Sequence, residues 1–268
     1  MRLRVFVFVF ILALLLLNCK KNKETSFLQE NQVRITQPRL VATNQFIDSV
    51  AILTANLKLE GAKIYYTDNG ENPTEKSTAY TKPIKVFKPG VYKFKAYHTD
   101  WKPSKIVEKV FYKRGFPIEK IVWDTKPSKK YKGVGLSTLN NNQKAGIDFK
   151  DEQWLGFDTI AKASLTLKNV TFVKSLNIGY LKDPGSWIFP PERIKVETSK
   201  DGIHFKNKTI EIQPLEKVSS ISIEYADIEI NEDIKFLRVE VRNTASIPDW
   251  HEGKGTKGWL FMDEWILK

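Results

Sequence analysis

An alternation of apolar and polar residues with a period of two begins near residue 35 and constrains the fold more than any other feature. In the stretch 91–97 (VYKFKAY), Tyr92, Phe94 and Ala96 fall on one face, and Lys93 and Lys95 fall on the other. The stretches 193–197 and 236–242 repeat this pattern, and no stretch keeps a helical period. Such alternation is typical of β-strands that bury one face. The sequence therefore predicts an all-β protein.

Turn sequences separate the predicted strands at short intervals. They are Asp-Asn-Gly at 68–70, Lys-Pro-Gly at 88–90, Asp-Pro-Gly at 183–185 and Lys-Asp-Gly at 200–202. Short strands joined by such turns indicate β-sandwiches. At roughly 150 residues per domain, the 268 residues suffice for two of them. We predict one sandwich at 35–113 and a second at 117–268.

The N-terminal segment differs from everything that follows. Arg2 and Arg4 precede an unbroken apolar run at 5–17. This run is shorter than the roughly 20 residues that cross a bilayer, and it suits a secretory signal peptide. The Leu-Leu-Asn-Cys sequence at its end resembles the lipobox of bacterial lipoproteins, although Asn18 stands where that pattern has Gly, Ala or Ser.

This resemblance implies that residues 1–18 are removed and that Cys19 is lipidated. Residues 19–34 are polar and aperiodic, so they are expected to form a tether. The protein would then be anchored to the membrane of the bacterial envelope, at the periplasmic face or the cell surface of the outer membrane. An ordinary signal peptide with an incidental cysteine and a short membrane anchor are the alternatives. Because Cys19 is the only cysteine, a disulfide framework is excluded.

The net charge of +12 raises the question of a nucleic-acid partner. Removing residues 1–18 takes away two arginines and no acidic residue, which lowers the charge to +10. The remaining lysines are scattered along the predicted strands, apart from a small cluster at 126–132. We therefore expect solvated strand faces and no nucleic acid. One cysteine and three histidines also exclude a zinc finger and a histidine-rich metal cluster.

The first predicted domain carries a specific motif. Tyr-Tyr-Thr-Asp-Asn-Gly-Glu-Asn-Pro-Thr at 65–74 leads through Tyr-Thr-Lys-Pro-Ile at 80–84 to Lys-Phe-Lys-Ala at 93–96. This order resembles the immunoglobulin-like C-terminal domain of chitobiases and β-hexosaminidases, with Asn69 where the family usually has Asp. An Asn-Gly pair tolerates the positive φ of a hairpin turn. The motif therefore predicts a turn and carries no chemistry.

The second predicted domain carries three further motifs. They are GSWIFPP at 185–191, DWHEG at 249–253 and WLFMDE at 259–264. Together they resemble the discoidin-like (coagulation factor 5/8 type C) jelly roll, which is also used as a carbohydrate-binding module. The resemblance is to the version that follows the immunoglobulin-like domain in bacterial β-N-acetylhexosaminidases. It implies a ligand site on loops at one end of the sandwich.

Candidate ligand-binding residues follow from the chemistry of sugar recognition, which needs a flat apolar face and fixed polar groups. Trp187 and Trp250 would supply the faces, and Asp183, Asp249 and His251 the hydrogen bonds. The expected partner is a glycan, either an amino-sugar-containing polymer or a host glycan. Trp187 and Trp250 could equally be buried anchors of their loops.

The other tryptophans of this domain have a simpler interpretation. Trp154, Trp259 and Trp265 lie in alternating or apolar contexts, which predict core positions.

The discoidin-like resemblance also implies a structural calcium ion, held by an early loop and by a late glutamate. The matching positions are Asn140, Asn142 and Glu264. The aspartate that is usual in this loop is missing, although calcium prefers carboxylate ligands. No other cofactor is expected.

Catalysis is not expected. Asp263-Glu264 is similar to the catalytic pair of hexosaminidases, but adjacent strand residues point to opposite faces and cannot flank one glycosidic bond. The barrel that carries that pair in the family needs βα repeats, which this sequence lacks. We therefore predict a non-catalytic, lipid-anchored, glycan-binding protein. The alternatives are a structural lipoprotein that packs against a separately encoded glycoside hydrolase, and a hexosaminidase remnant without a ligand.

Overall fold

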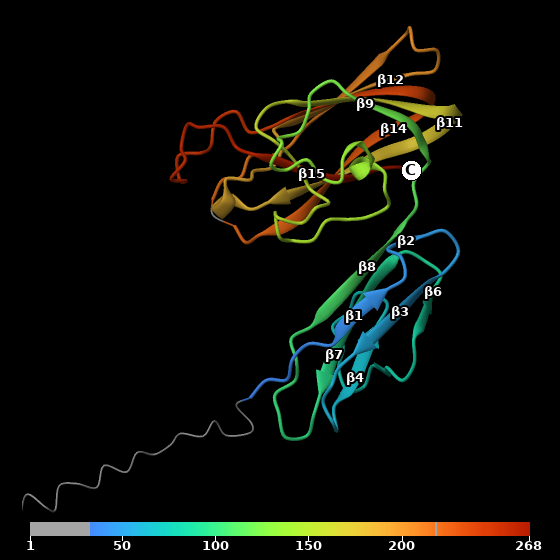
Figure 1. The fold of residues 1–268 in the computed structure, drawn as a ribbon, viewed down its shortest axis with the longest axis vertical. Coiled ribbons are helices and arrows are strands. Elements are labelled where there is room, and N and C mark those ends of the chain that lie inside the picture. The colour runs from blue at the N-terminus through green and yellow to red at the C-terminus, as the bar shows by residue number, and fades with distance from the viewer. Residues whose placement is uncertain (1–32, 218) are drawn as a thin grey trace, which may run out of the picture.

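Two β-sandwich lobes follow one another along the chain in the computed structural model (Figure 1), which describes residues 33–217 and 219–268. The predicted all-β class with two sandwiches is confirmed. In the described residues, the helical pieces are the short 3₁₀ turns η2 (Leu136–Leu139) and η3 (Pro184–Ser186). No helix in this part of the chain has the length and apolar character needed to cross a membrane. The predicted signal peptide and Cys19 lie outside the described residues.

The first lobe packs a three-stranded sheet against a five-stranded sheet. The smaller sheet has the order β1 (Arg39–Ala42), β3 (Ala51–Asn56), β6 (Ile84–Val86). The larger has the order β2 (Phe46–Ile47), β8 (Val107–Lys113), β7 (Gly90–Tyr97), β4 (Lys63–Thr67), β5 (Thr78–Ala79). Their facing side chains form a core that includes Leu53, Val86, Phe94 and Phe111.

Alternation within β7 explains this arrangement. Phe94 and Ala96 are fully buried, whereas Lys93 and Lys95 on the other face stay partly exposed. The turn after β4 also forms as expected. Gly70 has a φ of 81°, which glycine adopts without steric cost, and the Asn69 side chain accepts a hydrogen bond from the N–H of Glu71.

The second lobe is built from one seven-stranded sheet that folds over on itself. Its strands are β9 (Ile118–Trp123), β10 (Leu155–Phe157), β11 (Ala161–Lys182), β12 (Arg193–Ser199), β13 (Lys206–Glu211), β14 (Ser222–Arg242) and β15 (Leu260–Leu267). The first half of β11 pairs with β9, and its second half pairs with β15. The long strands β11 and β14 pair along their length and therefore belong to both layers of the sandwich.

The sequence pattern suggests two strands at 163–168 and 171–181, but the structure joins them in β11. The pairing of β11 with β14 shifts register between Thr166 and Thr171 and again between Val173 and Ser175. Such irregularities bend a strand, which allows β11 to pass from one layer to the other.

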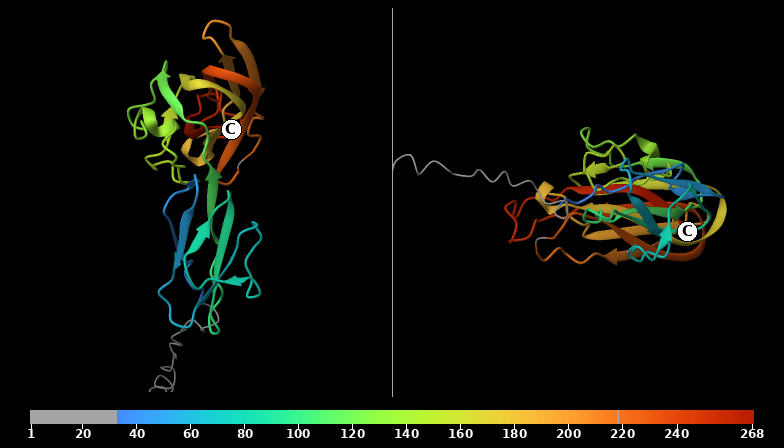
Figure 2. Two further views of the ribbon diagram at one scale, coloured as in Figure 1. Left: turned by 90° about the vertical axis from the view of Figure 1, so that its right-hand side faces the viewer. Right: turned by 90° about the horizontal axis from the view of Figure 1, so that it is seen from below.

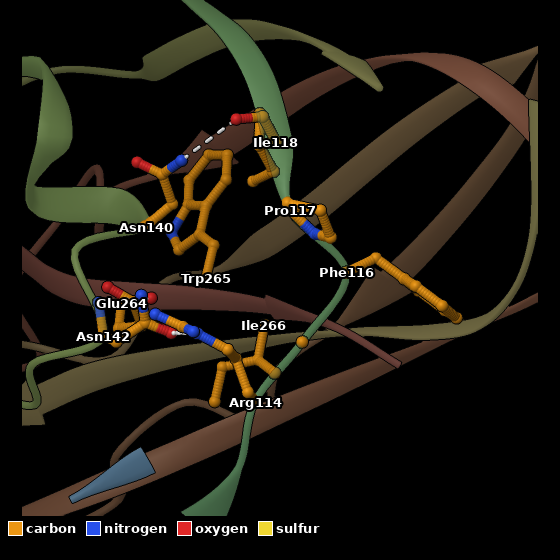
Figure 3. Close-up of a pocket in the computed structure, with 10 residues that line it drawn as sticks. Arg114, Phe116, Pro117, Ile118, Asn140, Asn142, Glu264, Trp265 and Ile266 are labelled. Atoms are coloured by element: carbon orange, nitrogen blue, oxygen red, sulfur yellow. Dashed lines mark hydrogen bonds between the residues drawn. The ribbon is translucent and has the colours of Figure 1, made fainter. Parts of the chain in front are cut away.

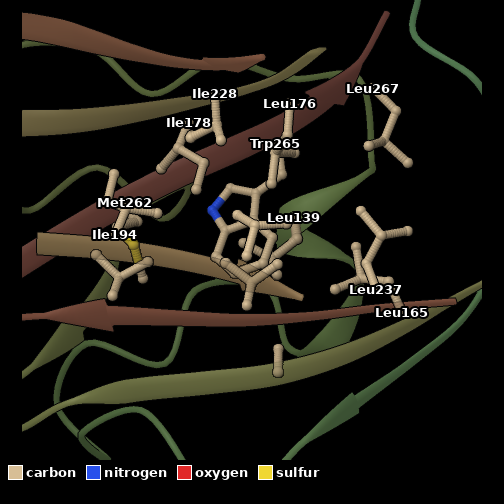
Figure 4. Close-up of a cluster of buried hydrophobic side chains, with 14 of the residues drawn as sticks. Leu139, Leu165, Leu176, Ile178, Ile194, Ile228, Leu237, Met262, Trp265 and Leu267 are labelled. Carbon is tan, nitrogen blue, oxygen red and sulfur yellow. The ribbon is translucent and has the colours of Figure 1, made fainter. Parts of the chain in front are cut away.

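The main core of the second lobe lies between the two layers (Figure 4). Side chains from both halves of β11, from β12, β14 and β15 meet there, among them Leu165, Ile178, Ile194, Leu237 and Trp265. Each is nearly inaccessible to solvent. Burial of one such side chain contributes roughly 1.5–3 kcal/mol, so this core fixes the frame on which the loops are held.

Several contacts join the two lobes. The hydroxyl groups of Tyr112 and Tyr225 lie 2.8 Å apart. Arg114, between the lobes, donates to the carboxylate of Asp48 in the first lobe and to the side chain of Asn142 in the second. The connection after Arg114 contacts β15, because the N–H of Phe116 donates to the carbonyl of Leu267 at 2.8 Å.

Candidate functional site

The predicted glycan-binding residues lie on two segments at one end of the second lobe. One segment is η3 with the residues around it, and the other is the loop 243–259 between β14 and β15. Figures 1 and 2 show η3 in gold and the loop in red at the same end of the lobe, away from the C-terminus. We call these two segments together the aromatic loop site.

A tight turn at Asp183–Ile188 presents Trp187. The main chains of Asp183 and Ile188 exchange two hydrogen bonds, of 3.0 and 3.1 Å. Between them, Trp187 has a left-handed conformation with φ 59° and ψ 22°. That conformation costs a bulky residue about 1–3 kcal/mol. Hydrogen bonds from the Trp187 N–H to Pro184 O and from the Trp259 N–H to Trp187 O hold it in place.

His251 lies at the centre of the aromatic loop site. Its Nδ1 accepts a hydrogen bond from the N–H of Gly253 at 2.9 Å, so the proton is on Nε2, which donates to the carbonyl of Pro184 at 2.9 Å. The ring packs edge to face against Trp187, Trp250 and Phe189, with ring centroids 5.1, 5.5 and 5.3 Å away. His251 therefore joins the two segments and has no ring nitrogen left for a ligand.

The two tryptophans are half-buried, so neither of the two expectations for them holds in full. Trp250 donates its Nε1–H to the carbonyl of Leu215 at 3.0 Å, which anchors one edge of the indole. The hydrogen bonds among the described residues give the Trp187 Nε1–H no acceptor. Gly253 provides the space for this indole, because a Cβ at that position would lie 2.2 Å from Trp187 Nε1.

The two aspartates lie in different surroundings. Asp183 is buried with 6% of its surface exposed, at the base of the Trp187 turn. Asp249 is exposed at the tip of the loop and forms an ion pair of 3.1 Å with Lys254. The structure thus gathers Asp183, Trp187, Trp250 and His251 in one place and leaves Asp249 at its outer edge.

A groove of about 430 Å³ adjoins the aromatic loop site, and it was not predicted. Its walls are mostly apolar, and its polar residues include Glu192, Glu211 and Gln213. The apolar lining residues are Phe189, Pro190, Pro191, Ile212, Pro214, Leu215 and Pro248. The Phe-Pro-Pro sequence at 189–191, part of a motif identified in the sequence, forms one wall of the groove. Pro214 and Leu215 belong to the connection after β13, where nothing in the sequence indicated which loop they would meet.

The three residues predicted to hold calcium also come together, in a second pocket near the junction of the lobes (Figure 3). This pocket of about 350 Å³ is lined by Asn140, Asn142, Glu264 and Arg114, among others. Glu264 Oε1 accepts a hydrogen bond from the N–H of Asn142 at 3.0 Å, and Oε2 is buried without a partner. Burial raises the pKa of Glu264 to about 8.

One expectation about this region was wrong. Asp263 and Glu264 do not point to opposite faces of β15, because a bulge interrupts the strand there. Met262 pairs with Tyr180 and Trp265 with Ile178, so that two residues of β15 lie opposite the single residue between them on β11. A bulge of this kind breaks the strict alternation of side chains.

Both carboxyl groups consequently contact the loop 142–145. Asp263 accepts hydrogen bonds from the side chain of Lys144 at 2.8 Å and from the N–H of Ala145 at 3.2 Å. Lys144 also donates to the main-chain carbonyl of Glu264 at 3.0 Å. Asp263 is completely buried and Lys144 nearly so, which places this ion pair out of reach of a substrate.

These contacts leave a poor set of donors for calcium. The pocket offers one carboxylate, Glu264, whose raised pKa favours the neutral form. Arg114 already donates to Oδ1 of Asn142 at 2.9 Å, and Lys144 takes the main-chain oxygen of Glu264. In the described part of the chain, no group of three or more His, Cys, Asp or Glu side chains could hold a metal ion. The residues present do not fit calcium, which stays a prediction from the resemblance alone.

The other tryptophans follow their prediction in part. Trp154 and Trp265 are buried core residues, with 1% and 2% of their surfaces exposed. Trp259 is half-buried and contacts Tyr131, with ring centroids 5.4 Å apart.

The fold and these sites define a two-lobed β-sandwich protein with an aromatic loop site at one end of its second lobe. Residues 43–108, most of the first lobe, match the family model of the chitobiase/beta-hexosaminidase C-terminal domain. This match confirms the resemblance predicted for the first lobe. No curated protein matches the chain.

Several solved structures are similar to part of the chain. A CBM32 module produced by Clostridium perfringens, in complex with GlcNAc-α-1,4-galactose, has 12% identity and a TM-score of 0.35, and the match covers 56% of this chain and 89% of that one. The C-terminal domain of a chitobiase from Bacteroides fragilis has 11% identity and a TM-score of 0.34, with coverage of 57% and 91%. An F5/8 type C domain from Bacteroides fragilis has 10% identity and a TM-score of 0.35, with coverage of 55% and 89%.

Proposed function

We infer that this chain is a non-catalytic envelope protein, lipid-anchored at Cys19, whose second lobe binds a glycan at the aromatic loop site. The observation that carries this proposal is the pair of half-exposed indoles, Trp187 and Trp250, held around His251 beside an apolar groove. Partly exposed indole faces suit the C–H face of a pyranose. Glu192, Glu211 and Gln213 in the groove supply groups for sugar hydroxyls.

The strained conformation of Trp187 supports the same function. A left-handed tryptophan costs stability, and residues with such strain cluster at functional sites. The turn holds the indole in position, while its N–H stays without an acceptor among the described residues. A sugar hydroxyl or an amide carbonyl could accept this hydrogen bond.

Calorimetry with the full chain in detergent, on glycans first selected on an array, tests the site. The double variant Trp187→Ala/Trp250→Ala should lose binding. Phe172→Ala is the matched control, because Phe172 is an aromatic residue of the same lobe that is 52% exposed on β11. Equal binding by the double variant and the wild type would reject the site.

A second candidate function is packing against a separately encoded glycoside hydrolase. It is favoured by the anchored state of the site, in which both ring nitrogens of His251 and the N–H of Trp250 bond to the protein itself. Two results together would support this alternative. A glycoside hydrolase from the envelope would co-purify with the wild type and not with the Trp187→Ala/Trp250→Ala variant, and the wild type would bind no glycan.

The lipid anchor has its own test. Cys19→Ser should abolish labelling of the protein with radioactive palmitate and release it from the membrane fraction. Unchanged labelling would show that the lipid is attached to another residue, and a wild type without label would show that no lipid is attached.

A further inference from the structure

Another pocket of the second lobe has aromatic walls and a rim of lysines, and it is separate from the two sites described above. It has a volume of about 520 Å³ and lies between the segments 130–133 and 149–154. Both segments belong to the loops before β10, drawn in light green in Figure 2, which project from one side of the lobe. We call it the Tyr131 pocket.

Its aromatic walls are held firmly. The Tyr131 ring packs against Trp259 and Phe261, with centroids 5.4 and 4.7 Å away. Phe149 stands nearly perpendicular to Tyr131 at 6.3 Å. Trp154, with 1% of its surface exposed, also lines the pocket. These contacts fix the rings, so a ligand that stacks on them would not have to order them first.

Three lysines, Lys130, Lys132 and Lys150, line the same pocket. The ammonium of Lys130 lies 5.2 Å from the centre of the Tyr131 ring, and that of Lys150 lies 5.7 Å from the centre of Phe149. None of these three lysines forms an ion pair with another residue in the part of the chain that the structure describes. Their charges are therefore available to a ligand directly beside the aromatic walls.

Two acidic residues line the pocket as well, and one of them is turned toward the main chain. Asp151 accepts hydrogen bonds from the N–H of Gly146 at 2.7 Å and of Gln153 at 2.9 Å, one on each carboxylate oxygen. Glu152 is exposed. The lining side chains thus carry three positive and two negative charges, and one negative charge is engaged in shaping the loop.

Lysines on the sheet of this lobe are placed differently. Lys162 on β11 pairs with Glu240 at 3.0 Å, and Lys195 on β12 pairs with Glu197 at 2.9 Å. Solvated strand faces, the interpretation favoured by the sequence, account for these lysines. They do not account for the lysines of the 126–132 cluster that reach the Tyr131 pocket.

We propose that the Tyr131 pocket binds an acidic sugar unit, a pyranose that carries a carboxylate or a sulfate. The C–H face of the pyranose would stack on Tyr131, with its edge toward the perpendicular ring of Phe149, and the anionic group would accept hydrogen bonds from the lysines at the rim. A neutral sugar would use only the first of these contacts, so the lysines determine the preference for acidic sugars.

The position of Trp259 links this pocket to the aromatic loop site. Trp259 contacts Tyr131 through its ring, and its N–H donates to the carbonyl of Trp187 at 2.8 Å. One polysaccharide could therefore reach both places, with an acidic unit in the Tyr131 pocket. Only this linkage rests on the proposed glycan-binding function, since the pocket can bind an acidic sugar by itself.

Calorimetry with the full chain in detergent tests the proposal with three probes: an oligogalacturonate, the matched neutral oligogalactose, and a sulfated oligogalactose. The charge-removing double variant Lys130→Gln/Lys150→Gln is compared with Lys195→Gln/Glu197→Gln and Lys195→Gln/Lys162→Gln on the sheet. The second control removes the same net charge as the pocket variant. The carboxylated and sulfated probes show which acidic group is preferred.

The wild type should bind an acidic probe more tightly than the neutral one, and added salt should weaken that binding. Lys130→Gln/Lys150→Gln should weaken it about tenfold, or about 1.4 kcal/mol, and leave the neutral probe unaffected. Equal weakening by the Lys195→Gln/Lys162→Gln control would overturn the proposal, because it would indicate a response to net charge. Competition by inorganic sulfate at the same concentration as the sulfated sugar would also overturn it, because the sugar ring would then contribute nothing.

Failure of the proposed function is distinguishable from failure of this inference. If Trp187→Ala/Trp250→Ala leaves acidic binding intact and Lys130→Gln/Lys150→Gln abolishes it, the Tyr131 pocket is a site and the aromatic loop site is not. The reverse result rejects the Tyr131 pocket and retains the proposed function.

Discussion

The ammonium group of Lys144 lies 2.8 Å from Oδ1 of Asp263, and both side chains are withdrawn from solvent. The pair joins an early loop of the second lobe to its last strand. Lys144 also faces the rings of Tyr112 and Tyr225, at 5.8 and 5.0 Å, where the two lobes meet. The lysine therefore connects the loop, the bulge of β15 and the junction between the lobes.

Breaking this buried pair should destabilise the second lobe strongly. Lys144→Met leaves Asp263 buried without its cation, which costs about 3–5 kcal/mol in comparable pairs. Urea unfolding followed by tryptophan fluorescence measures the effect, since six of the seven tryptophans are in this lobe. Lys195→Met, which breaks a partly exposed pair, is the control and should cost at most about 1 kcal/mol. Similar losses in the two variants would contradict a special role for the buried pair.

Glu264 should make the lobe less stable as the pH rises. Its folded pKa of about 8 exceeds the ordinary value of 4.5, so the folded state keeps a proton that the unfolded state has released between these pH values. Stability therefore falls from pH 4.5 to 8 and levels off above the folded pKa, by up to about 1.4 kcal/mol per pKa unit.

Glu264→Gln replaces the carboxyl group with an amide that does not ionise, so the decline in stability with pH should be smaller. The variant therefore gains stability relative to the wild type as the pH increases. Urea unfolding at a series of pH values measures the difference. Glu240→Gln is the control. Its hydrogen bond with Lys162 lowers the pKa of Glu240 below 4.5, so this carboxyl is charged in both the folded and unfolded states above that pH, and the difference from the wild type should stay constant from pH 5 to 8. A constant difference between Glu264→Gln and the wild type from pH 5 to 8 would show that Glu264 ionises normally.

Calcium should have little effect on this protein, because Arg114 and Lys144 occupy oxygen atoms that a calcium ion would need. A ligand that binds only the folded state raises its stability in proportion to the logarithm of its concentration. Thermal unfolding in excess calcium and in a chelator should therefore give the same midpoint. If calcium raises the midpoint and Glu264→Gln abolishes that increase, the protein has the calcium site that the resemblance implies.

Much of the fold could be predicted from the period-two pattern, because alternation on strands such as β7 directly sets which face is buried. The bulge at Asp263-Glu264 could not be, since a single extra residue is compatible with the same apolar pattern on either side. This bulge brought both carboxyl groups to one loop, where alternation predicted that they would separate. Lys144 was missed for a related reason: a lysine in a polar loop gives no sign of burial until its partner is known.

The aromatic loop site could be predicted in its residues and only partly in its roles. Chemistry singled out Trp187, Trp250 and His251, and the fold gathers them. The sequence could not indicate that His251 bonds to Pro184 and Gly253, because these bonds depend on how two distant loops meet. For the same reason, the Leu215 carbonyl that anchors Trp250 lies in a segment without any motif.

The space beside Trp187 offers a direct test of the aromatic loop site. In Gly253→Ala, the new Cβ would lie 2.2 Å from Trp187 Nε1, so the indole must move. Glycan binding should weaken by up to about tenfold, because one well-placed stacking contact is worth about 0.5–1.5 kcal/mol. Calorimetry measures the affinity, and near-ultraviolet circular dichroism reports the displaced tryptophan.

Gly185→Ala is the matched control, in the turn that presents Trp187. Its Cβ would meet no atom closer than Asp183 Oδ1 at 3.6 Å, an ordinary contact, and Gly185 does not have a positive φ. This variant should therefore keep the affinity and the near-ultraviolet spectrum of the wild type. If Gly253→Ala changes the spectrum while the affinity stays the same, Trp187 is an anchor of its loop and the glycan binds elsewhere. If both glycine variants lose binding equally, the two segments of the site are sensitive to any substitution, and the indole has no specific role.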